Sequence, residues 1–196
     1  MDRVHQEMGV ERLETFSDSV LAVIITLTAI ELRAPAQGSL HAMGHALPTL
    51  LVYVVNFAFL GIYWNNHHHL LRSATRISAG IMWSNLALLF ALSLIPVMTQ
   101  WVGAHYRDTA PAVTYGIVAL AAGACYQVLT RAIVRAEDHP HVARVVGRGI
   151  KGAISIAGYA LGVALALVSP WLGYALYVAV TVLWLVPDRR FARATH

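Results

Sequence analysis

The stretch ERLETFSDSVLAVIITLTAIELRAP, residues 11–35, begins as a charged segment and becomes apolar within two helical turns. Ser17 and Asp18 stand where the apolar run begins, and the next charged residue is Glu31. With its flanks, the run approaches the ~20 residues that a helix needs to cross a bilayer. It therefore predicts a membrane-spanning helix that carries an acid on its first turns and threonines deeper in.

The composition extends this prediction to the whole chain. Of the 196 residues 58% are hydrophobic and 12% are charged, whereas a soluble domain is about 25% charged. The apolar runs are continuous rather than alternating, which favours helices over a β-barrel. The sequence predicts an all-α integral membrane protein, a single unit over residues 1–196, with six spans at about 13–33, 46–70, 77–102, 111–134, 150–169 and 171–187.

The basic residues predict the orientation of these spans. Six spans place both termini on the same side as the 71–76 and 135–149 connections, and that side holds 12 of the 14 lysines and arginines. The opposite side holds Arg33 and Arg107. Cytoplasmic loops are the basic ones, so we expect a multi-pass cell-membrane protein with both termini cytoplasmic. The net charge of +4 then reflects topology rather than nucleic-acid binding.

Proline and glycine suggest finer features of the spans. Pro48 falls near the predicted start of the second span, where a missing N–H costs least. Pro96 lies inside the third span and removes the hydrogen bond to the carbonyl of Leu92, so a kink is expected there. Gly158 and Gly162 form a G-x-x-x-G pair, which we interpret as close packing inside one bundle rather than a seam between subunits.

The first span carries two distinct stripes. At 100° per residue, one third of its circumference holds an apolar and hydroxyl stripe: Arg12, Phe16, Ser19, Val23, Thr26, Leu27 and Ile30. Asp18 lies on another face, with Glu11 and Glu14. Spacing alone leaves simpler roles open, because Ser17 and Asp18 could solvate a helix end and the threonines could bond back to their own helix.

Polar partners for Asp18 occur in the next two spans at the same predicted depth. Trp64, His67 and His68 share a face near the end of span two, while Trp83 and Asn85 lie early in span three. A cluster of such groups can satisfy its own hydrogen bonds, as lipid demands. The three adjacent histidines do not predict a metal site, because consecutive helical residues diverge by 100° and no zinc-binding spacing accompanies them.

Three segments resemble one known family in the right order. They are R-x-x-x-F-S-D at Arg12, Phe16, Ser17 and Asp18 with the following AVIITLTAIEL, then YWNNHH, then WSNLALLFALSLIP. Over residues 12–100 the chain resembles the transmembrane-protein-175 potassium channel family. The resemblance implies a six-helix subunit whose first helix lines a central ion path in a homotetramer. It implies potassium as the permeant ion and no cofactor or metal, with lipids and further copies of the chain as partners.

The resemblance also assigns residues. The apolar constriction falls on Val23, Leu27 and Ile30, and the hydroxyl layer that aids selectivity falls on Thr26. The motif network that locks the first helix to its neighbours falls on Arg12, Phe16, Ser17, Asp18, His67 or His68, Trp83 and Asn85. These constriction residues are the ones that the helical stripe contains. The T-V-G-Y-G filter of other potassium channels is absent from the sequence.

Two other functions remain as alternatives. A secondary transporter of a cation would usually show inverted repeats and broken helices at mid-membrane, and the two halves of this chain do not mirror each other. A membrane enzyme could use the histidine cluster, but the sequence has no serine elbow, nucleotide loop or paired-carboxylate pattern. We therefore expect a channel and no enzymatic activity.

Overall fold

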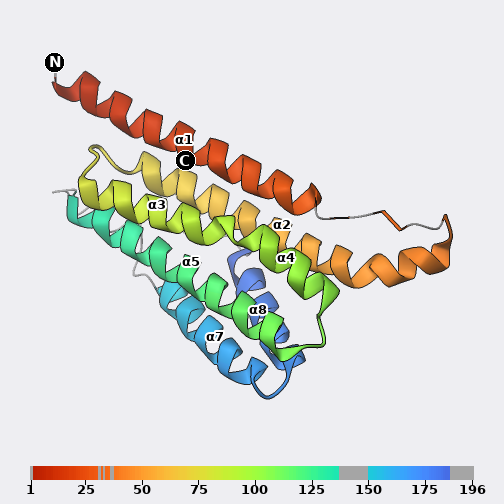
Figure 1. Cartoon of the computed structure of the whole chain (residues 1–196). Coiled ribbons are helices and arrows are strands. Elements are labelled where there is room, and N and C mark those ends of the chain that lie inside the picture. Colours follow the sequence, from red (N-terminus) through yellow and green to blue (C-terminus); the bar gives the residue numbers. More distant parts are fainter. Residues whose placement is uncertain (1, 31, 33, 36–37, 137–149, 186–196) are drawn as a thin grey trace, which may run out of the picture.

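All secondary structure that the structure describes is helical (Figure 1). The structure is a computed structural model, and it describes residues 2–30, 32, 34–35, 38–136 and 150–185, with the side chains of these residues except those at 2–8, 42, 45 and 150. The helices are α1 (Asp2–Ile30), α2 (Leu40–Arg72), α3 (Ala79–Ser93), α4 (Ile95–Ala104), α5 (Thr109–Ala136), α7 (Ile150–Ala166) and α8 (Pro170–Leu185).

Four helical stretches are long and apolar enough to cross a membrane: Gly9–Ile30, Ala46–Arg72, Ala79–Ala104 and Thr109–Ala136. The α7 and α8 helices are shorter, with 17 and 16 residues. At 1.5 Å per residue these two reach only about 25 Å, slightly less than the hydrocarbon thickness. Most of the described part of each predicted span is therefore helical, and four of the helical stretches have full membrane-spanning length.

The third span is broken where its proline predicts a kink. The α3 helix ends at Ser93 and α4 begins at Ile95, with Pro96 in the first turn of α4. A buried hydrogen-bond chain fixes α4 after this break. The Asn56 amide nitrogen donates to Thr99 Oγ1 at 2.6 Å, and the Tyr115 hydroxyl donates to Asn56 Oδ1 at 2.6 Å. This chain ties α4 to α2 and α5 inside the apolar core.

The second span begins earlier than its proline suggests. The α2 helix starts at Leu40, so Pro48 lies inside the helix and not in its first turn. The apolar stretch starts at Ala46, and hydropathy could not detect the additional helical residues before it. The expectation that Pro48 marks a helix start is wrong, although it is close to the start of the apolar stretch.

The bundle has α1 at one side and the α7–α8 pair at the other, with α2, α3, α4 and α5 between them (Figure 1). α1 packs on α2 and also touches α3 and α4. The G-x-x-x-G pair of α7 lies inside the subunit. A Cβ atom on Gly158 would lie 2.6 Å from Val180 Cγ2, and one on Gly162 would lie 2.4 Å from Tyr177 Cε1. The absence of side chains at these glycines lets α8 approach α7.

Candidate functional site

One face of α1 has no packing partner among the residues that the structure describes. Val23, Leu27 and Ile30 are 55%, 44% and 71% exposed, and Thr26 is exposed between the first two. The opposite face is fixed in the bundle, because Leu21 and Thr28 are completely buried. The predicted constriction and hydroxyl layer thus share one uncovered face.

The exposed arc of α1 is wider than the predicted stripe. Ala22 and Ala29 are exposed as well, although they lie beside the stripe and not within it. Ile24, one position after Val23, is 3% exposed and packs in the core. Burial therefore fixes which side of α1 faces its own bundle. Which of the exposed residues lie at the centre of the uncovered side stays a prediction.

The hydroxyl of Thr26 is oriented by its own helix. Its Oγ1 donates to the carbonyl oxygen of Val23 at 2.8 Å. Because the hydroxyl proton is used in this bond, the lone pairs of Oγ1 remain available to a cation. The sequence alone left open that the threonines only bond back to their own helix. Thr26 does form such a bond, and the bond still leaves its oxygen able to contact a cation.

A buried hydrogen-bond chain joins α1, α2 and α3. Asn85 Nδ2 donates to Ser17 Oγ at 2.9 Å, and Asn85 Oδ1 lies 2.6 Å from His67 Nε2. Ser17 Oγ in turn donates to the carbonyl oxygen of Leu13 at 2.8 Å. Since Asn85 Oδ1 can only accept, His67 carries a proton on Nε2. Ser17, His67 and Asn85 are completely buried, so this chain fixes the rotation of α1 against its neighbours.

A partly exposed ionic group, here called the Glu14 cluster, lies beside this chain and consists of Glu14, Asp18, His68 and Arg72. His68 Nδ1 lies 2.9 Å from Glu14 Oε1 and 3.5 Å from Asp18 Oδ2. Arg72 Nε donates to the same Glu14 oxygen at 3.1 Å. These contacts connect the acidic face of α1 to the end of α2.

Not all residues of the predicted motif network meet in one chain. Ser17, His67 and Asn85 form the buried chain, and Asp18 meets His68, so both histidines have a role. Trp83 is 70% exposed and Phe16 is 49% exposed. Arg12 is exposed and has no ion pair among the described residues.

The reason that Arg12 and Trp83 stand apart is their helical position. Arg12 lies on the uncovered face of α1, away from Asp18, and Trp83 precedes Asn85 by two residues and so points from the other side of α3. Within the described part of the single chain Arg12 forms no ion pair with Asp18 and Trp83 is exposed, so their place in the motif network stays a prediction. Glu14 was missed as a partner of His68, although its i,i+4 spacing from Asp18 was a signal.

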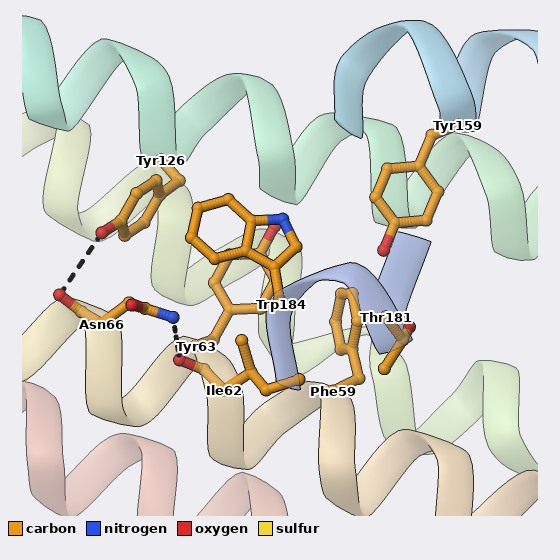
Figure 2. A pocket seen from close by; sticks show the side chains of 8 residues that line it. All are labelled: Phe59, Ile62, Tyr63, Asn66, Tyr126, Tyr159, Thr181 and Trp184. Atoms are coloured by element: carbon orange, nitrogen blue, oxygen red, sulfur yellow. Dashed lines mark hydrogen bonds between the residues drawn. The ribbon is translucent and has the colours of Figure 1, made fainter. Parts of the chain in front are cut away.

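A separate small cavity lies between α2, α5, α7 and α8. Figure 2 shows its wall, which is formed mainly by the rings of Phe59, Tyr63, Tyr126, Tyr159 and Trp184. The polar groups near it are largely occupied: Tyr126 donates to the Asn66 carbonyl oxygen at 3.3 Å, and Trp184 Nε1 donates to Ser155 Oγ at 2.7 Å. Its volume of about 30 Å³ holds about two water molecules, so it is a packing gap and not a substrate site.

Comparisons with known proteins show the family of the chain. The family described as "Endosomal/lysosomal potassium channel TMEM175" matches residues 12–96. A potassium channel of Chryseobacterium sp. (strain P1-3) is 39% identical over 184 residues, which cover 93% of this chain and 96% of that protein. The chain belongs to the TMEM175 potassium channel family. It is therefore a multi-pass membrane protein of an ion-channel family and not an enzyme.

Two further relatives support the TMEM175 assignment. A potassium channel of Streptomyces collinus (strain DSM 40733 / Tue 365) is 32% identical over 170 residues, which cover 81% of this chain and 82% of that protein. The crystal structure of a lysosomal potassium-selective channel TMEM175 homologue from Chamaesiphon minutus has a TM-score of 0.80 at 21% identity. The match covers 91% of the present chain and 97% of the chain in that crystal structure. The present chain therefore has a TMEM175-like fold over nearly its whole length.

Proposed function

We propose that four copies of this chain form a potassium channel and that α1 of each copy lines the central ion path. The observation that carries the proposal is the uncovered face of α1. Val23, Leu27 and Ile30 are exposed apolar side chains, and Thr26 places an oxygen between them. We propose potassium as the permeant ion because the two bacterial relatives are named potassium channels.

The side chains of this face suggest how the path works. Rings of Val23, Leu27 and Ile30 exclude water when they are narrow, and an apolar constriction of this kind closes a channel by dewetting. Four Thr26 hydroxyls form a layer of oxygens at which a cation that has lost part of its water is stabilised. Potassium, which is dehydrated more easily than sodium, is favoured there.

The buried chain of Ser17, Asn85 and His67 serves the same function indirectly. It holds the opposite side of α1 against α2 and α3, so that the uncovered face keeps its direction toward the axis. The resemblance still assigns three further residues to the motif network: Arg12, Phe16 and Trp83. Because their side chains are exposed in the single chain, they can contact a neighbouring subunit.

The orientation proposed for each subunit has both termini in the cytoplasm. The Glu14 cluster and the buried chain then lie toward the cytoplasmic side, and the α4–α5 connection at His105 lies outside. The excess of arginine and lysine on the cytoplasmic side supports this arrangement.

Reconstitution in a planar bilayer with a potassium/sodium gradient tests the function. We expect single-channel currents with a reversal potential displaced toward the potassium equilibrium potential. Transport without resolvable unitary currents would instead indicate a secondary transporter, because carrier turnover is too slow to give currents of single-channel size.

A further inference from the structure

The Glu14 cluster brings three metal-ligating groups from two helices to one point. We propose that Glu14, Asp18 and His68 bind a divalent transition-metal ion of the zinc class. One ligand atom from each residue lies within 4.8 Å of the other two. Metal binding at this point is independent of which face of α1 lines an ion path.

The distances fit a tetrahedral ion. Zinc lies about 2.0–2.2 Å from nitrogen and oxygen ligands, which places the ligand atoms about 3.4 Å from one another. His68 Nδ1 lies 2.9 Å from Glu14 Oε1 and 3.5 Å from Asp18 Oδ2. Glu14 and Asp18 are one helical turn apart and so share a face of α1. All three ligand atoms lie within 4.8 Å of one another, so binding an ion at the tetrahedral spacing requires side-chain rotation.

The hydrogen bonding of the cluster gives an independent indication. Asp18 Oδ1 and His68 Nδ1 are shielded from solvent, and neither has a hydrogen-bond partner of acceptable geometry among the described residues. Shielded polar atoms of this kind are costly unless something satisfies them. A cation bound between the two carboxylates and the imidazole nitrogen satisfies His68 Nδ1, and it satisfies Asp18 Oδ1 as well when this oxygen, rather than Oδ2, is the ligand atom.

Access and charge also favour an ion from the aqueous side. The side chains of Glu14, Asp18 and His68 are 15%, 31% and 23% exposed, so a water molecule can supply the fourth ligand. Two carboxylates and one imidazole form a mixed oxygen and nitrogen set, which suits zinc and similar borderline ions. Arg72 competes through its bond to Glu14, but its side chain is 65% exposed and can move away.

The test uses the purified full-length protein in detergent, titrated with Zn²⁺ by calorimetry and with Co²⁺ by visible absorption. We expect binding in which Glu14→Gln and His68→Gln each weaken the affinity at least tenfold, as a rough lower limit for losing a ligand. His69→Gln is the matched control, because His69 is the adjacent exposed histidine of α2. It should bind as the wild type does.

The Arg72→Gln variant controls for a loss of Zn²⁺ affinity that is caused only by misfolding. It removes a competing cation without removing a ligand, so it should bind Zn²⁺ several-fold more tightly than the wild type. Absence of Zn²⁺ binding by a folded wild-type protein would overturn the proposal. An equal loss of affinity in His69→Gln and His68→Gln, or weaker binding in Arg72→Gln, would also overturn it.

Discussion

At the scale of single residues, Thr26 and Thr28 have the same side chain and the same kind of hydrogen bond but differ in exposure. Both hydroxyls donate to a carbonyl oxygen three residues earlier, at 2.8 Å and 2.6 Å. Thr28 is completely buried, whereas Thr26 lies on the uncovered face. Of these two threonines only Thr26 can therefore offer its oxygen to an ion, so we assign the proposed selectivity layer to Thr26.

Replacing Thr26 with Val tests this assignment. The change keeps the volume nearly constant and removes the oxygen, so the preference for potassium over sodium should fall while current persists. Reversal potentials under a potassium/sodium gradient measure the effect. Thr28→Val is the control and should leave the reversal potential unchanged. A shift in Thr28→Val without one in Thr26→Val would refute the assignment.

At the scale of helices, the position of α1 depends on the buried hydrogen bonds of Asn85. Asn85→Ala removes the partner of His67 Nε2 and one partner of Ser17 Oγ. An unsatisfied buried group costs about 1–3 kcal/mol, so the unfolding temperature should fall by several degrees. Thermal unfolding in detergent measures this. Asn65→Ala, an exposed position on α2, should change it little, and equal shifts in the two variants would contradict the account.

The contact between α7 and α8 depends on glycine. Gly162→Ala introduces a Cβ atom 2.4 Å from Tyr177 Cε1, whereas a Cβ on Gly61 meets nothing within 4 Å. Overpacking of this kind costs about 1–3 kcal/mol, while alanine suits an uncrowded helix better than glycine does. We expect Gly162→Ala to unfold at a lower temperature than the wild type and Gly61→Ala to be neutral or stabilised. Equal unfolding temperatures of the two variants would show that the close contact between α7 and α8 does not depend on Gly162.

At the scale of the whole molecule, the topology is proposed from the distribution of charge, and the assembly is proposed from the uncovered face of α1. Cysteine placed at position 105 should react with an impermeant thiol reagent from outside intact cells. Native mass measurement of the purified protein should give four subunits. Labelling of position 105 only after lysis would reverse the proposed orientation, and a stable monomer would remove the basis for a shared ion path.

Much of the architecture was predictable because lipid imposes it. Continuous apolar runs located the helices, and Pro96 located the break before α4. The 3.6-residue period separated Val23 and Leu27 from Leu21, which is buried. Contacts between helices were less predictable, because they depend on the rotation and offset of each pair. The sequence indicates the depth of a residue along its span but not these quantities, so it placed Arg12, Trp83 and Asp18 at one depth without showing their contacts and could not pair Glu14 with His68.

The most direct test of the central claim is thiol modification along α1 during recording of potassium currents. After Cys125, the native cysteine, is replaced with Ala, single cysteines are placed at Leu27 and at Ile24. A water-soluble thiol reagent should alter the current through Leu27→Cys, because that side chain lies on the uncovered face. It should not affect Ile24→Cys, whose side chain packs in the core. Modification that changed the current through Ile24→Cys and left Leu27→Cys unaffected would show that this face of α1 does not line the ion path.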